Sequence, residues 1–119
     1  MALKTIRLEL ARNPDFPSGS TAHGYEFVAP LDEDGHLDML AWREHRAACV
    51  VRRFWVGDDD QHGRLIHHRG HHWAFHYDDA AEDDEPIFRF DQHRFVRNDY
   101  VSITEHDGIQ RTFRVADIR

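Results

Sequence analysis

The sequence predicts a mainly β protein, either a small antiparallel barrel or a strongly curved sheet, with one short helix. Seven or so short segments alternate apolar and polar residues or are rich in β-branched and aromatic residues, and turn signals separate them. Only one stretch carries a helix-start signal. The 119 residues, of which 40% are hydrophobic, fit a single domain spanning residues 1–119 with one core.

Apolar residues at every second position predict the first two strands, at residues 5–10 and 24–30. Between them, residues 13–20 contain two prolines and a glycine, which predicts a loop. Pro30 is expected to end the second strand. The side chains expected to face the core are Ile6, Leu8, Leu10, Tyr25, Phe27 and Ala29.

A short helix is predicted at residues 39–48. Asp38 precedes it as an N-cap, because its carboxylate can accept a hydrogen bond from a free amide of the first turn. Leu37 and Trp42 have the spacing of a hydrophobic staple, which would fix the angle at which the chain enters the helix.

Residues 49–56 (CVVRRFWV) predict a strand, and residues 57–60 (GDDD) predict the polar loop after it. Two further strands, at 64–68 and 72–78, are joined by a loop of three residues. That loop length places His68 opposite His72 and gathers the apolar residues of both strands on one face, whereas a two-residue loop would scatter them.

Residues 78–85 contain six carboxylates and predict a solvated loop, and a short strand is expected at residues 87–90. The last hairpin turns at residues 106–108, with Gly108 in a left-handed conformation. Its register pairs Glu105 with Ile109, Ile103 with Arg111 and Val101 with Phe113. The inner face is then Val101, Ile103, Ile109, Phe113 and Val115, and the outer face is Tyr100, Ser102, Thr104, Gln110, Thr112 and Arg114.

This C-terminal segment, FVRNDYVSITEHDGIQRTFRVADI (residues 95–118), is similar to strand pairs in SH3-like barrels. Taken whole, the chain resembles a group of uncharacterised small proteins from alphaproteobacteria, through GYEFVAPLD, WREHR, VRRFW and YVSITEHDG. The resemblance implies one compact domain and no particular activity.

Charge and composition exclude several classes of function. The formal net charge of −7 repels phosphate backbones and argues against general nucleic-acid binding. No apolar run is long enough to span a bilayer, and the first residues lack a secretory signal, so we expect a cytoplasmic protein that binds no membrane. A single cysteine, Cys49, excludes an internal disulfide and a cysteine-based zinc cluster.

The histidine-rich hairpin is the candidate metal site. His68 and His72 face each other across the hairpin, and His71 could be a third ligand for zinc. A metal-binding protein or a metal-dependent hydrolase is therefore the alternative hypothesis. The competing interpretation is an ordinary polar surface, because the histidine order matches no known ligand motif.

The candidate binding face combines aromatic and arginine side chains: Arg53, Trp55, Phe95, Arg97 and Tyr100. If these residues lie outside the core, they suit an unknown protein, a peptide or a small anionic ligand. The competing interpretation is buried aromatics beside ordinary surface arginines. We predict a non-catalytic binding module with no catalytic residue and no cofactor, which could also form homo-oligomers through exposed strand edges.

Overall fold

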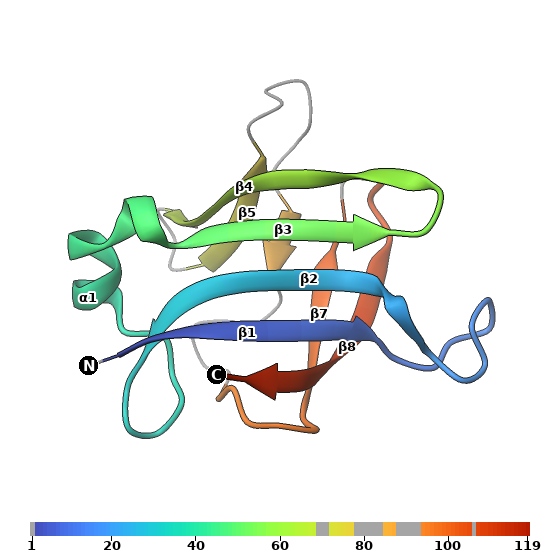
Figure 1. The fold of residues 1–119 in the computed structure, drawn as a ribbon, viewed down its shortest axis with the longest axis horizontal. Helices are drawn as coiled ribbons and strands as arrows, with labels where there is room; N and C mark the ends of the chain where they lie inside the picture. The colour runs from blue at the N-terminus through green and yellow to red at the C-terminus, as the bar shows by residue number, and fades with distance from the viewer. Residues whose placement is uncertain (1, 69–71, 78–84, 88–93, 106) are drawn as a thin grey trace.

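The computed structural model describes residues 2–68, 72–77, 85–87, 94–105 and 107–119. Within them, eight antiparallel strands follow one another in chain order, and β8 pairs with β1 to close a barrel (Figure 1). The predicted mainly β class with one short α-helix is confirmed. The strands are β1 (Ala2–Leu10), β2 (Ser20–Leu31), β3 (Val50–Trp55), β4 (Asp58–His68), β5 (His72–Tyr77), β6 (Glu85–Ile87), β7 (Tyr100–Thr104) and β8 (Gln110–Ile118).

The first two strands have the predicted faces but are longer than predicted. β1 begins at Ala2 and β2 runs past Pro30 to Leu31. Pro30 is tolerated because it lies near the end of β2, where its missing amide breaks little of the ladder. All six residues predicted to face the core are buried: Ile6, Leu8, Leu10, Tyr25, Phe27 and Ala29.

The helix begins where the sequence predicts and ends earlier. α1 spans Met39–Glu44, and the Asp38 carboxylate accepts a hydrogen bond from the Ala41 amide at 3.1 Å. The chain then tightens into a single 3₁₀ turn, η1 (Arg46–Ala48). Such a turn is a common way for the last carbonyls of a helix to find partners.

The loop predicted at residues 57–60 is reduced to a turn at Gly57, and the prediction is wrong for residues 58–60. β4 already begins at Asp58, which pairs with Trp55, and Gly57 makes the turn with a φ of 89°. Aspartates are poor strand formers, but here the pairing with β3 and an ion pair between Arg52 and Asp60 at 3.0 Å favour the extended chain.

Both later hairpins have the predicted register. His68 pairs with His72 and Leu65 with Phe75 across β4 and β5. β6 begins earlier than predicted and pairs with β7 through Ile87 and Ile103. The acidic loop predicted at residues 78–85 lies outside the described residues, apart from Glu85 at the start of β6.

In the β7–β8 hairpin, the predicted orientation of one inner-face residue is wrong. Val101, Ile103, Phe113 and Val115 are buried as predicted, but Ile109 is 52% exposed. The inner positions near this turn belong to charged residues instead, because Glu105 and Arg111 form an ion pair that fills the space.

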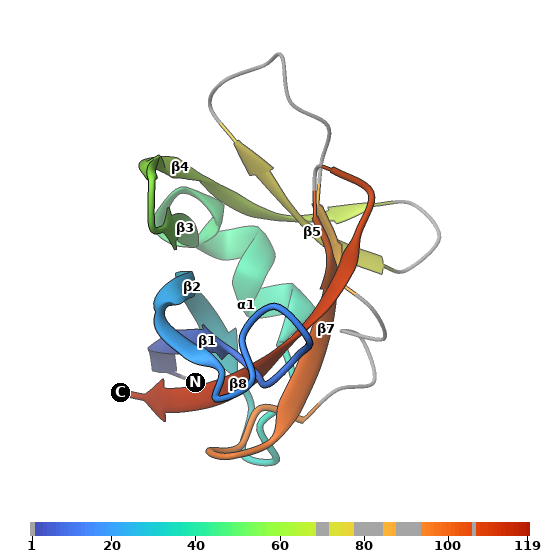
Figure 2. The same cartoon turned by 90° about the vertical axis from the view of Figure 1, so that its right-hand side faces the viewer.

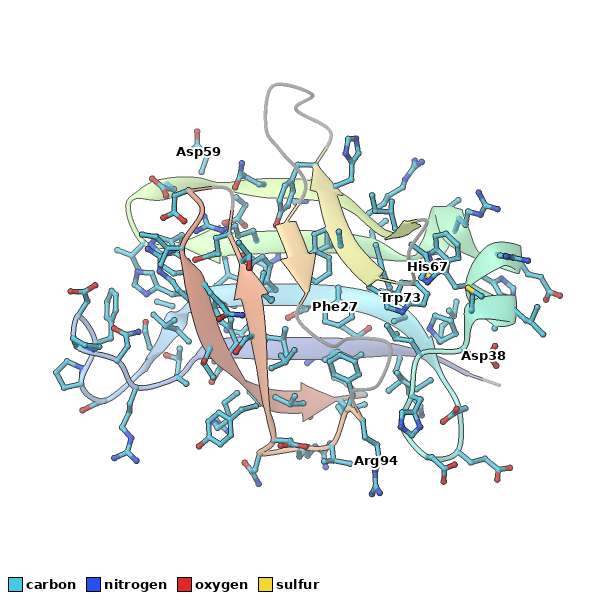
Figure 3. All side chains as sticks on the ribbon, turned by 180° about the vertical axis from the view of Figure 1, so that it is seen from behind. Phe27, Asp38, Asp59, His67, Trp73 and Arg94 are labelled. Carbon is cyan, nitrogen blue, oxygen red and sulfur yellow. The ribbon has the colours of Figure 1, made fainter. Side chains whose placement is uncertain are left out.

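The two ends of the barrel are closed differently. α1 lies at one end, near the buried Trp73 (Figure 3), and the ring of Trp42 on α1 meets that of Trp73 with centroids 5.3 Å apart. The loop of residues 11–19 lies at the other end, beside β8 (Figure 2). Among the described residues, no helix has both the length and the apolar character needed to cross a membrane.

Candidate functional site

Two of the five residues predicted to bind a ligand lie on the surface. Tyr100, at the start of β7, is 55% exposed and pairs with Arg114 of β8. Arg97 is exposed, and one of its nitrogens donates to the Asp117 carboxylate at 2.9 Å and to the Ile118 carbonyl at 3.1 Å. Tyr100 therefore offers an open aromatic surface, whereas Arg97 is partly engaged within the chain.

The other three residues are wholly or partly buried. Phe95 belongs to the core, where its ring centroid lies 5.9 Å from that of Phe27. Arg53 is only 5% exposed, and its guanidinium carbon lies 4.4 Å from the ring of the half-buried Trp55. The structure thus brings Arg53 and Trp55 into contact inside one end of the barrel. Whether any of the five binds a ligand stays a prediction.

The same end of the barrel contains a buried charge cluster of Tyr25, Arg53, Glu105 and Arg111. The Glu105 side chain is fully buried. It accepts hydrogen bonds from the Tyr25 hydroxyl at 2.5 Å, from Arg53 Nε at 3.1 Å and from Arg111 Nη1 at 2.7 Å. Three donors around one carboxylate compensate much of the cost of removing its charge from water.

Both arginines of the charge cluster remain cationic. Burial lowers the pKa of Arg53, but the contacts with Tyr25 and Glu105 outweigh it and the net pKa is raised. For Arg111, burial likewise lowers the pKa, while hydrogen bonds to Asp107 and Glu105 raise it further than burial lowers it. Two cationic side chains therefore converge on Glu105 within the barrel.

His23 lies beside the charge cluster and holds the 11–19 loop. Its ring contacts Trp55 edge-on at 4.4 Å between centroids and Phe16 of the loop at 4.6 Å. Its Nδ1 lies 2.6 Å from the Ser20 hydroxyl. Burial, followed by the charge of Arg53, lowers the pKa of His23, so the neutral imidazole is favoured in the folded protein.

A surface groove runs between the 11–19 loop and β8. Its first part is a hollow of about 310 Å³, lined on one side by residues 12–15 and on the other by residues 109–112. Its second part is a hollow of about 210 Å³ that includes Ser18, Tyr100 and Arg114. Arg12 lines both parts. We call the two hollows together the loop groove.

Backbone hydrogen bonds and a glycine turn hold the loop that forms one wall of the groove. The Ala11 amide donates to the Thr112 carbonyl of β8 at 3.0 Å, and Asn13 exchanges two backbone hydrogen bonds with Phe16. Gly19 has a φ of 72°, and a Cβ there would lie 2.7 Å from the Leu10 carbonyl oxygen. Only glycine fits this position without a shift of the backbone.

A larger hollow, of about 450 Å³, lies on the outer face of β1 to β4. Its lining includes the exposed Val50, together with Glu26, Arg52 and Arg64. Glu26 lies within 4.0 Å of three arginines, which balance its charge. Those arginines are Arg7, Arg52 and Arg119. This face is therefore mainly a network of ion pairs.

The predicted metal ligands are only partly described. The backbone register places His68 directly opposite His72, as predicted, while His71 lies outside the described residues. In the described part of the chain, one other group could hold a cation, formed by Asp32, Asp34 and His36. It is an exposed turn in which the Asp32 carboxylate accepts hydrogen bonds from the backbone amides of the other two residues.

Comparison with known proteins gives no relative: no family model, no curated protein and no solved structure matches this chain. The case for a function therefore depends on the geometry of the chain itself.

Sequence reasoning missed Arg12 and Glu105. The alternation of the last hairpin contains a signal for Glu105, because it follows Val101 and Ile103 on the inner face. The predicted register also places Arg111 opposite Ile103, on the same face as Glu105, so it indicated two opposite charges on that face. Nothing in the sequence indicated that Arg12, inside a loop, would line a groove.

Proposed function

We propose that this protein is a non-catalytic binding module that holds an extended, acidic peptide segment of a partner protein in the loop groove. The observation that carries the proposal is Arg12. It is exposed, it lines both hollows of the groove, and its guanidinium has no hydrogen-bond or ion-pair partner within the part of the chain that the structure describes. A free cation at the centre of a groove suits an anionic ligand.

The charge of the groove supports this choice. Three arginines line it, and two of them are ion-paired: Arg111 with Glu105 and Asp107, and Arg114 with Glu9. The whole chain, by contrast, has a formal net charge of −7. The positive charge that the groove offers is therefore that of Arg12, which attracts an acidic segment while the rest of the surface repels non-specific polyanions.

The dimensions of the groove favour a peptide over a small ion. Ile109 and Tyr100 lie near its two ends and are 52% and 55% exposed. Tyr100 pairs with Arg114, five residues beyond Ile109 on β8, so the ends are roughly 17 Å apart at the usual rise of a strand. An extended segment of about five residues would span them, with an apolar or aromatic contact at each end.

Two finer expectations belong to the same proposal. We propose that the β7–β8 hairpin is SH3-like, supported by its register and its glycine turn, with no wider likeness implied. We also propose a cytoplasmic location, supported by a single cysteine, Cys49, which is buried and unpaired.

Zinc binding is the second candidate function, and the pairing of His68 with His72 favours it. Directly opposed residues of a hairpin have Cβ atoms about 5 Å apart, which lets two imidazoles share one ion. A third ligand would have to come from elsewhere, with His71 as the sequence-based choice.

The test of the main proposal is the fluorescence anisotropy of labelled hexaglutamate, with hexalysine as the control peptide. Hexaglutamate should bind, more weakly as salt is added, and hexalysine should not. Arg12→Gln should weaken the binding about fivefold, which is roughly 1 kcal/mol.

The matched control is Arg43→Gln, which removes one exposed arginine from α1, at the other end of the barrel. It should leave the affinity within about twofold of the unaltered protein. Equal losses in the two variants would show that only net charge matters, and absence of hexaglutamate binding would overturn the proposal.

A further inference from the structure

We infer that Arg111 recognises a carboxylate of the ligand through a two-nitrogen fork, and that Glu105 positions it for this role. The inference rests on the proposed function and names the group that the groove selects: the side-chain carboxylate of a glutamate or aspartate.

All the hydrogen bonds that the Arg111 side chain donates to described residues come from one nitrogen, Nη1. Nη1 donates to Glu105 Oε1 at 2.7 Å and to the two oxygens of Asp107 at 3.2 and 3.0 Å. Nε and Nη2 have no hydrogen-bond partner within the residues that the structure describes. The side chain is 24% exposed, and Arg111 lines the groove.

The two unengaged nitrogens have the geometry that a carboxylate needs. Nε and Nη2 lie on one edge of the planar guanidinium, so their parallel N–H bonds match the two oxygens of a carboxylate. A lysine presents a single point of charge and cannot reproduce this fork. Arg111 is therefore suited to recognition by shape as well as by charge.

Glu105 fixes the guanidinium from the opposite side. Its carboxylate is itself held by Tyr25 of β2 and Arg53 of β3, so two strands of the barrel anchor it. The Trp55 ring also restrains Arg111, with the guanidinium carbon 5.6 Å from the ring centroid. A side chain that is already ordered loses little entropy when a ligand binds.

The ion pairs of Arg111 also separate its role from that of Arg12. Glu105 and Asp107 already neutralise Arg111, so its attraction for an anion at long range is small and its selectivity comes from the fork. Arg12 has no such partners and acts mainly as a positive charge. Replacement of Arg111 by lysine should therefore weaken binding even though the positive charge is kept.

The test measures the affinity of labelled hexaglutamate for Arg111→Lys and for the matched control Arg43→Lys. Arg111→Lys should bind about tenfold more weakly than the unaltered protein, and Arg43→Lys on α1, outside the loop groove, should bind within about twofold of it. Equal affinity for Arg111→Lys and the unaltered protein overturns the inference but leaves the proposed function standing. If the unaltered protein itself does not bind hexaglutamate, the proposed function fails first.

Two further measurements guard against a folding defect. In ¹⁵N spectra of the unaltered protein, the Arg111 Nε–H signal should shift as hexaglutamate is added, and an unmoved signal at saturation overturns the inference. For the positioning role, Glu105→Gln is compared with the unaltered protein at a temperature at which circular dichroism shows both to be folded; it should weaken binding there and add nothing in the Arg111→Lys protein. Additive losses would show that Glu105 does not act through Arg111.

Discussion

Replacement of Glu105 by glutamine should destabilise the protein severely, even though the two side chains have nearly the same shape. Glutamine has one carbonyl oxygen where Glu105 uses two, with Oε1 serving Arg111 and Oε2 serving Tyr25 and Arg53. The Arg53 side chain is 6% exposed, and its nearest other carboxylate, Asp58, is 4.0 Å away and 64% exposed. Arg53 would therefore stay buried without a full counter-charge.

Loss of one partner from a buried ion pair costs about 3–5 kcal/mol, out of a total stability of roughly 5–15 kcal/mol for a typical domain. Equilibrium unfolding in urea should show this loss as a lower midpoint with an unchanged slope. The added substitution Arg53→Met should recover part of the stability, because no charge is then left buried beside the glutamine.

The matched control is Asp60→Asn, which removes the partner of Arg52 from an ion pair of 3.0 Å whose side chains are 37% and 43% exposed. Solvent screens this pair, so the loss should stay below about 1 kcal/mol. A loss below about 1 kcal/mol for Glu105→Gln as well would refute the argument that the charge cluster stabilises the barrel.

Three other predictions concern the loop and the histidines. Because the pKa of His23 is lowered on folding, the unfolded chain takes up its proton first, so the free energy of unfolding should fall as the pH drops below about 6.5. The His23→Gln protein should show a smaller fall between neutral pH and pH of about 5, and an equal fall would contradict this assignment. Gly19→Ala should cost about 1–3 kcal/mol in urea unfolding, because the φ of 72° and the contact with Leu10 leave no room for a Cβ, and a neutral effect would mean that the loop is not held as described. If the His68–His72 hairpin is a metal site, elemental analysis of protein purified without an affinity tag should find about one zinc per chain, and the His68→Ala/His72→Ala variant should lack it. Metal-free unaltered protein would remove that hypothesis.

The strands and their registers could be predicted because the pattern is local. Alternation placed Ile6, Leu8 and Phe27 in the core, and the three-residue loops fixed both later hairpins. The β3–β4 turn could not be predicted in the same way. Residues 57–60 have the composition of a loop, but Asp58 pairs with Trp55 and the Asp60 side chain forms an ion pair with Arg52, so β4 already begins at Asp58.

The candidate site was harder to predict because facing at a barrel end depends on long-range contacts. Arg53 was predicted on a binding face, but it is buried against Glu105, which is 52 residues away in the chain. Ile109 was placed inside because it is apolar, and it is exposed because the charge cluster fills the inner positions near the turn. Arg12 gains its importance only from the path of the 11–19 loop across β8.

The measurement that tests the central claim most directly is a ¹H–¹⁵N NMR titration of the unaltered protein with hexaglutamate. The loop groove predicts that the shifted backbone amides gather in residues 11–19, at Tyr100 and in residues 109–114. The larger hollow on β1 to β4, near Val28 and Val50, serves as an internal control, and its amides should not move. Shifts centred on that hollow, or no shifts at all, would contradict the claim that the loop groove binds an acidic peptide.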